Sequence, residues 1–260
     1  MKQRRKRTML NSHRHEYILE KLQASDKVTV ADLMTGLDVS DETVRRDLKD
    51  LESKGLLRRI HGGAIGVAKI RDEPIRERAR KSAKEKIVIA QRAVELISDH
   101  TSIFLDTGST TEALAKQLGR FTDLKLYTNS LNVALAAREH FGVSVFVTPG
   151  ELRKVELDLV GYDTVDYIRN YLFDTVFMGT AGVDGERGFM DFEEDESRIR
   201  QALMKSARNK VMLADGSKFG KTANICTARF EAIDRLVTDA KPAKNFYSVF
   251  ERSGMDVTHG

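Results

Sequence analysis

The sequence is poor in several features, and each shortage excludes a class of protein. Its 260 residues contain a single cysteine, Cys226, which excludes an internal disulfide and a thiolate metal site. No apolar run approaches the ~18 residues that a membrane helix needs, and the basic N-terminus lacks the apolar stretch of a secretory signal. Hydrophobic residues still make up 41% of the chain, too many for wholesale disorder. We expect a cytoplasmic, disulfide-free protein of roughly two domains.

Positive charge is concentrated at one end of the chain. The net charge is +4, yet residues 1–65 hold 14 basic and 10 acidic side chains, so the remainder is neutral. This asymmetry indicates a polyanionic partner for the N-terminal part alone. For the basic cluster at residues 2–7, a solvated tail is an equally good interpretation.

The N-terminal part has the pattern of three helices joined by short connections. Apolar spacing predicts a helix over residues 12–24, and a short β-branched segment leads into a second helix that ends at Gly36. Ser40 is a good N-cap for a third helix over residues 41–55. The tight connection before that helix is typical of a helix-turn-helix.

The third helix has an apolar back and a basic front. Val44, Leu48 and Leu51 recur at helical spacing and predict the buried stripe. Arg46 lies nearly opposite that stripe, a position from which an arginine reaches guanine edges or phosphates in the major groove. Thr43 and Lys49 flank Arg46, and Arg45 lies at the side. Taken alone, the arginine pair also fits an ordinary solvated helix face.

A basic β-wing is predicted after this helix. The sequence LLRRIHGGAIG reads as two short strands around a turn at Gly62 and Gly63. Arg58, Arg59 and His61 would lie along phosphates or in the minor groove. No ligand partner stands at metal spacing from His61, so we expect no metal there. The ordered combination of turn, capped helix and wing favours binding to double-stranded DNA.

The rest of the chain alternates between strand-like and helix-like segments. We place a winged helix-turn-helix domain at residues 1–66, a charged linker at 67–82, and a second domain at 83–260. Repeated βα units predict an α/β domain with a mostly parallel sheet and helices on both faces. The predicted strands are 101–106, 124–130, 143–150, 174–182, 210–217 and 235–240; the predicted helices are 84–97, 110–118, 131–141, 162–172, 193–208 and 245–254.

Polar loops follow the predicted strands, where ligands bind in such folds. Hydroxyl and backbone N–H donors at the start of a helix predict a phosphate cradle over residues 108–111; the absence of a GK[ST] sequence excludes a P-loop, and we expect no cofactor. Each polar residue alone fits a helix cap, but together they favour a small anionic, hydroxylated ligand. The candidate effector residues are Asp106, Gly108, Ser109, Thr110, Thr111, Asn129, Ser130, Gly150, Glu151 and Lys218.

Five stretches, one in the N-terminal part and four in the C-terminal part, resemble a known family. VSDETVRRDLKDLESKGLLRRIHGGA is similar to the signature of the DeoR family of bacterial transcription regulators, and LDTGSTTEALAKQL, TNSLNVA, PGEL and DGSKFGK resemble its C-terminal sensor domain. The resemblance implies a sensor similar in fold to ribose-5-phosphate isomerase and a phosphorylated sugar or polyol as effector. It also implies that Thr43, Arg45, Arg46, Lys49, Arg58 and His61 belong to the DNA-reading region. With the N-cap and the rest of the wing, the candidate DNA-binding residues are Ser40, Thr43, Arg45, Arg46, Lys49, Arg58, Arg59, His61, Gly62 and Gly63.

This sequence departs from the family pattern in two places. Pro149-Gly150 stands where Gly-Gly is usual, and the segment 189–197 is unusually acidic. If Glu193, Glu194 or Asp195 faces the ligand, it favours hydroxyls and disfavours a second phosphate.

Two functions remain open. The first is a repressor, dimeric or tetrameric, whose sensor ligand weakens DNA binding. The second is a sugar-phosphate isomerase using Asp106, Asp184 and Lys218 for acid–base chemistry. Fold likeness does not transfer catalysis, so we expect a regulator and not an enzyme.

Overall fold

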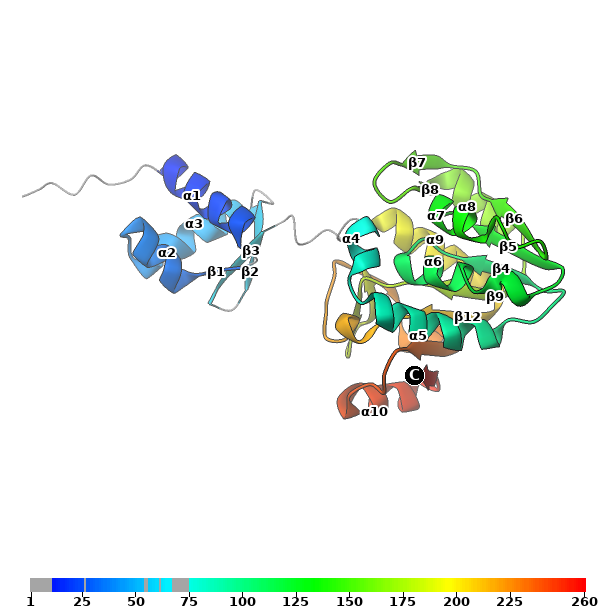
Figure 1. The fold of residues 1–260 in the computed structure, drawn as a ribbon. Coiled ribbons are helices and arrows are strands. Elements are labelled where there is room, and N and C mark those ends of the chain that lie inside the picture. Colours follow the sequence, from blue (N-terminus) through cyan, green and yellow to red (C-terminus); the bar gives the residue numbers. More distant parts are fainter. Residues whose placement is uncertain (1–10, 26, 54–55, 61, 67–74) are drawn as a thin grey trace, which may run out of the picture. The chain divides into compact units, whose positions relative to one another are not determined.

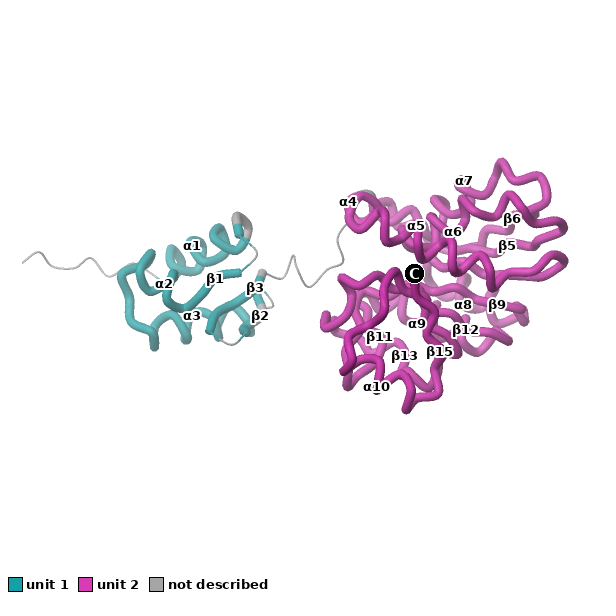
Figure 2. Tube along the Cα trace, turned by 60° about the horizontal axis from the view of Figure 1, so that its bottom comes forward, with its two compact units in different colours: residues 1–72 teal, residues 73–260 magenta. Residues whose placement is uncertain are grey.

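The computed structural model describes residues 11–25, 27–53, 56–60, 62–66 and 75–260. The basic cluster at residues 2–7 and His61 lie outside the described residues, as does the side chain of Arg58. The chain divides into two compact units, residues 1–72 and 73–260 (Figure 2). Each unit is described by itself.

The first unit is a winged helix-turn-helix. Helices α1 (Asn11–Ala24), α2 (Val30–Leu37) and α3 (Asp41–Ser53) accompany strands β1 (Val28–Thr29), β2 (Leu57–Ile60) and β3 (Gly63–Gly66). The strands form an antiparallel sheet in the order β1-β3-β2. Ile18 and Leu33 join the predicted stripe of α3 in one apolar core, which confirms the predicted face of that helix.

The prediction that Gly36 ends the second helix is wrong. Helix α2 continues to Leu37, and Asp38 caps it in the left-handed conformation at φ 51°, which short polar side chains tolerate. Gly36 instead serves packing, because a Cβ there would lie 2.2 Å from the hydroxyl oxygen of Tyr17 on α1.

A seven-stranded parallel sheet forms the centre of the second unit (Figure 1). Its order is β15-β14-β12-β9-β4-β5-β6, and every neighbouring pair is parallel. From β4 the chain adds strands on one side and then returns to the other, so the order reverses between β4 and β9. The strands are β4 (Ser102–Leu105), β5 (Leu124–Thr128), β6 (Val143–Val147), β9 (Phe173–Met178), β12 (Ala207–Leu213), β14 (Arg235–Thr238) and β15 (Asp256–His259).

Helices cover both faces of this sheet, as predicted. Ile103 and Leu105 of β4 point into the core beneath α5 (Ala83–Ala93), α6 (Ser109–Ala115) and α7 (Leu131–Ala137). Phe104 of the same strand points to the opposite core, which α8 (Tyr162–Arg169), α9 (Glu194–Lys205) and α10 (Lys244–Ser253) complete. Successive side chains of β4 therefore point alternately into the two apolar cores, one on each face of the sheet.

Several short elements were not predicted from the sequence. These are the hairpin β7 (Glu151–Arg153) and β8 (Asp158–Val160), the antiparallel sheet of β10 (Gly182–Asp184), β11 (Gly188–Asp191) and β13 (Ile225–Ala228), and the edge strand β15. Residues 75–82, which the sequence places in the linker, belong to the second unit. There α4 (Ile75–Arg80) buries Ile75, and Arg78 pairs with Glu156.

Candidate functional site

The exposed face of α3 is the first candidate site. Ser40 caps the helix, since its Oγ accepts the N–H of Thr43 at 3.4 Å. Arg45, Arg46 and Lys49 are all exposed, and Arg46 is 71% exposed. The two arginines pair with Asp41 and Glu42 one helical turn earlier. Exposed ion pairs at this spacing contribute only about 0.3–0.5 kcal/mol to helix stability. These arginines can therefore leave their carboxylate partners and bind a phosphate or a base edge instead.

A buried ion pair fixes this helix against α1, and the sequence reasoning missed it. Asp47 lies within the buried stripe and is 2% exposed. Arg14 donates two hydrogen bonds to its carboxylate, at 2.7 and 2.9 Å. The signal was a carboxylate at a core position of an amphipathic helix, because a buried charge requires a partner.

The wing lies beside α3, and its two glycines have different roles. Gly62 adopts φ +78°, which suits the turn, whereas a Cβ on Gly63 would lie 2.0 Å from the carbonyl oxygen of Val28 on β1. Glu52 of α3 accepts the backbone N–H of Arg59 at 2.8 Å and so ties the wing to the helix.

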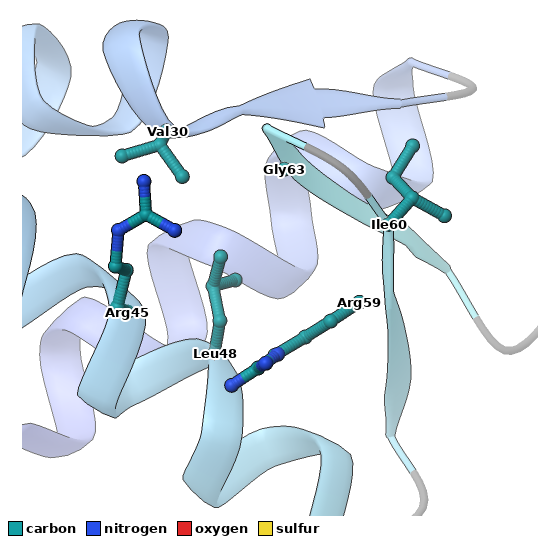
Figure 3. Close-up of a pocket in the computed structure, with 6 residues that line it drawn as sticks. All are labelled: Val30, Arg45, Leu48, Arg59, Ile60 and Gly63. Atoms are coloured by element: carbon teal, nitrogen blue, oxygen red, sulfur yellow. The ribbon is translucent and has the colours of Figure 1, made fainter.

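A small hollow separates α3 from the wing. Figure 3 shows the side chains of Arg45 from α3 and Arg59 from β2 at this hollow, with Val30, Leu48, Ile60 and Gly63 completing its lining. Two guanidinium groups from different elements thus stand next to one concavity, which suits an anionic backbone.

The second candidate site lies at the carboxyl ends of β4, β5 and β6. Within the described residues, four buried side-chain oxygens without a hydrogen-bond partner follow these three neighbouring strands: Asp106 Oδ1, Thr107 Oγ1, Asn129 Oδ1 and Thr148 Oγ1. Buried polar atoms are normally satisfied. Their concentration at one sheet edge, where the strand order reverses next to β4, is the geometry of a ligand site in an open α/β sheet. Sequence reasoning identified Asp106 and Asn129 but missed Thr107 and Thr148.

Two other predicted effector residues, Thr111 and Ser130, have local hydrogen-bond partners. Thr111 Oγ1 donates to the carbonyl of Gly108 at 2.8 Å. Ser130 Oγ accepts the N–H of Val133 at 3.4 Å and caps α7. Ser109 is buried and Thr110 half-buried in the first turn of α6, where backbone N–H groups lack intrahelical partners.

The remaining predicted effector residues lie farther along the edge. Glu151 is exposed at the start of β7. A Cβ on Gly150 would lie 2.2 Å from Thr164 Oγ1, so this glycine permits close packing on α8. Lys218 follows β12, two strands from β4 in the sheet order, and is half-buried.

A buried charge network adjoins Asp106. Arg200 of α9 is 4% exposed on its side chain and contacts three carboxylates: Asp106 at 2.6 Å, Asp191 at 2.6 Å and Glu196 at 3.1 Å. Arg153 of β7 bonds Glu196 at 2.6 Å and pairs with Asp158. Two guanidinium groups are therefore shared among four carboxylates. Sequence reasoning missed this network, whose members come from five separate elements or strand ends.

Burial perturbs the titration of the network. Desolvation raises the pKa of Asp106 to about 6, because it outweighs the attraction of Arg200. Burial also opposes the charge of Glu196, yet Arg200 and Arg153 together lower its pKa. Proximity to two cations thus keeps Glu196 ionised, while Asp106 titrates nearer to neutrality.

The acidic segment 189–197 divides between solvent and core. Glu194 and Asp195 are exposed, and Glu194 pairs with Arg198 at 2.6 Å. Asp191 and Glu196 are the buried members and belong to the charge network. Glu193 is half-buried, and none of the three acidic residues singled out from the sequence belongs to the charge network beside Asp106.

The described residues contain neither a membrane-spanning helix nor a metal-binding cluster. Across that part of the chain, no helix is long and apolar enough to cross a membrane. Over the same residues, no group of three or more His, Cys, Asp or Glu side chains could hold a metal ion.

Comparison with known proteins agrees with this two-part architecture. Residues 14–69 match the family model of the DeoR-like helix-turn-helix domain, and residues 81–240 match that of the DeoR C terminal sensor domain. The chain is 32% identical to the glycerol-3-phosphate regulon repressor of Escherichia coli, covering 90% of this chain and 93% of that protein. It is 34% identical to the HTH-type transcriptional regulator GolR of Listeria innocua, covering 96% and 98%.

Among solved structures, the match to ribose 5-phosphate isomerase A of Methanocaldococcus jannaschii covers 54% of this chain and 55% of that chain. The two are 19% identical over the match, and the TM-score is 0.39. The helix-turn-helix match, the sensor-domain match and the near full-length relatives establish that the chain belongs to the DeoR family of transcription regulators.

Proposed function

We propose that this protein is a repressor that binds double-stranded operator DNA and releases it when its sensor unit binds a phosphorylated sugar or polyol. One observation carries the DNA-binding part: an exposed basic face on the capped helix α3, next to a wing that contributes its own arginine. In this arrangement α3 enters the major groove and Arg46 reaches base edges, while Arg45 and Arg59 hold the phosphate backbone.

The test of this proposal is operator binding by Arg46→Ala. Loss of a base contact costs about 1–3 kcal/mol, which is a fall of roughly 5- to 150-fold in affinity. Arg198→Ala is a matched control, because Arg198 is a similarly exposed arginine paired one turn earlier with a glutamate. Normal operator binding by Arg46→Ala at physiological salt would contradict the groove assignment.

The four unpartnered oxygens after β4, β5 and β6 support a hydroxylated effector. A carboxylate and an amide oxygen accept hydrogen bonds, and the two threonine hydroxyls both donate and accept. These groups suit the hydroxyls of a sugar or polyol. The phosphate would lie on residues 108–111 with Lys218 as counter-charge, because Arg153 and Arg200 already share four carboxylates. The names of the relatives, which include a glycerol-3-phosphate regulon repressor, agree with this class of ligand.

Effector binding would act through linkage. The effector shifts the equilibrium between DNA-competent and released states only by its difference in affinity for them. A dimer or tetramer is required, since one short recognition helix reads too few base pairs. Helix α4 is the first described element of the second unit. It connects the start of this unit to the sensor sheet, because Arg78 pairs with Glu156 in the turn between β7 and β8.

A thermal-shift screen identifies the effector. Glycerol 3-phosphate, ribose 5-phosphate and hexose phosphates are compared with their unphosphorylated counterparts, and a hit is then tested for release of operator DNA. We expect Lys218→Ala to weaken the response to the hit while operator binding persists. Lys221→Ala is the control, being an exposed lysine in the same loop. A hit that shifts melting equally without its phosphate would contradict the phosphate assignment.

The isomerase alternative has one observation in its favour, the buried carboxyl of Asp106 with a pKa of about 6. A general base benefits from a pKa near the working pH. We expect no turnover of pentose or hexose phosphates by the purified protein. Turnover that Asp106→Asn abolishes would overturn this expectation.

A further inference from the structure

The two edges of the seven-stranded sheet differ in chemistry. Edge strands expose unpaired backbone groups, and proteins usually protect them with charged residues or proline. Strand β15 fits this rule, because it carries exposed Asp256 and His259, and Asp256 pairs with Arg235. Strand β6 has the sequence VSVFV, without charge or proline, and in the described part of the chain it pairs with β5 alone.

Exposed hydrophobic side chains concentrate around this unprotected edge. Of the eleven large hydrophobic side chains exposed in the described residues, nine fall between positions 135 and 172. That segment contains β6 and the end of α7, a helix that packs against β6. We call six of these side chains the β6 face: Leu135, Phe141, Phe146, Val147, Tyr171 and Leu172.

Aromatic contacts make part of this face continuous. The ring of Phe146, 40% exposed, stacks on Tyr127 of β5 at 4.7 Å between centroids. Tyr127 in turn contacts Tyr171 at 5.1 Å, and Leu172, which follows Tyr171, is 56% exposed. Phe146 and Tyr171 are therefore exposed around one buried ring, that of Tyr127. Clustered exposed apolar side chains mark an interaction site more often than scattered single residues do.

We propose that the β6 face binds a second copy of this chain, with the two β6 strands pairing antiparallel across a two-fold axis. Such an interface buries the same patch on both copies, so a charged residue on the strand is brought to the interface twice. The uncharged strand β6 brings no charged side chain there, whereas β15 would bring two copies of Asp256. The inference rests on the proposed DNA-binding function, which requires two recognition helices in one assembly.

Sedimentation of the full chain tests the proposal. Ser144→Lys adds a charge at an exposed position of β6, and His259→Lys adds one at an exposed position of β15 as the matched control. We expect the wild type and His259→Lys to sediment as dimers or larger assemblies. Ser144→Lys should halve the assembled mass at the same concentration, while its thermal shift with the effector hit is unchanged.

Disulfide trapping provides a second measurement that does not depend on tolerance of the lysine. Single cysteines placed in turn at residues 143–147, in a Cys226→Ser background, should yield a cross-linked dimer where a residue lies at the two-fold axis. A cysteine at His259 should yield none. The exposed position of Cys226 makes the background substitution a mild one.

Three results would overturn the proposal. A monomeric wild type refutes both the β6 interface and the dimer that the proposed function requires. An assembled wild type that Ser144→Lys does not dissociate, and that no β6 cysteine traps, refutes the interface but leaves the DNA-binding proposal intact. Equal dissociation by Ser144→Lys and His259→Lys shows a general charge effect and refutes the assignment to this edge.

Discussion

Asp106→Asn is expected to change how the stability of the sensor unit depends on pH. Asp106 is 1% exposed, and burial raises its pKa from an ordinary value of 3.8 to about 6 despite its contact with Arg200. Asparagine has nearly the shape of the protonated carboxyl and does not titrate. The variant therefore isolates the free-energy difference that arises from charging this one group.

The sign follows from proton uptake. Between about pH 4 and 6 the folded protein holds the proton on Asp106 while the unfolded chain has released it, so folding is linked to proton binding. The contribution of Asp106 to stability is greatest below pH 4 and is lost as pH rises through about 6. The full loss is about 3 kcal/mol, at ~1.4 kcal/mol for each unit of pKa. About half of it, roughly 1.4 kcal/mol, falls between pH 5 and pH 7.5.

Thermal unfolding of both proteins at pH 5 and 7.5, followed by circular dichroism, measures this difference. Relative to Asp106→Asn, the free energy of unfolding of the wild type should fall by about 1.4 kcal/mol between pH 5 and pH 7.5. For a unit of this size this corresponds to a fall of about 3–6 °C in Tm. Asp166→Asn, at an exposed position of α8, is the control and should show a much smaller change. A difference that does not depend on pH, or one that favours the wild type at pH 7.5, would refute the reasoning.

Four further substitutions test the packing around the two sites. Asp47→Ala should destabilise the first unit by about 3 kcal/mol and weaken operator binding, because it removes the carboxylate that orients Arg14 in a buried pair. Unfolding of residues 1–72 and operator titration measure the two effects. Unchanged stability would contradict the buried-pair assignment. Gly63→Ala should lower the free energy of unfolding by about 1–3 kcal/mol, since the Cβ would collide with the Val28 carbonyl. Gly62→Ala should lower it by about 1 kcal/mol, because Gly62 has open space around it but a positive φ. A larger loss of stability at Gly62 than at Gly63 would reverse the roles given to the two glycines. Arg200→Met should destabilise the sensor by about 3–5 kcal/mol, because it leaves three buried carboxylates without their shared cation; chemical denaturation measures this, and a variant as stable as the wild type would show that the network contributes little.

The first unit was largely predictable because its signals are local. Val44, Leu48 and Leu51 recur at helical spacing, and Ser40 lies three residues before the N–H that it accepts. The end of α2 was misplaced because Gly36 fits a helix-ending pattern, whereas its small size is needed for contact with Tyr17. A glycine selected for tertiary packing cannot be distinguished by local pattern from one selected for its backbone conformation.

The sensor site was predictable only in its strand-end residues. Asp106 and Asn129 could be identified because each follows a β-branched or apolar strand, and the carboxyl ends of parallel strands share one edge. Arg200 could not, because it meets Asp106 across 94 positions of sequence, and a lone arginine in a charged helix reads as a solvated side chain. The hairpin that positions Arg153 has strands of three residues, too short for a clear alternation.

The buried network also bears on which effector the site accepts. Arg153 and Arg200 are surrounded by Asp106, Asp158, Asp191 and Glu196, so this part of the sheet edge has more carboxylate than cation when all are ionised. A ligand with two phosphates would place its second phosphate against this excess, and a buried like-charge contact is costly. A monophosphate can instead hold its phosphate at residues 108–111 and turn its hydroxyls toward Asp106 and Asn129. We therefore expect the sensor to bind monophosphorylated sugars or polyols more tightly than bisphosphates. This difference in affinity should become smaller as pH falls toward the pKa of Asp106, because that carboxyl then becomes neutral.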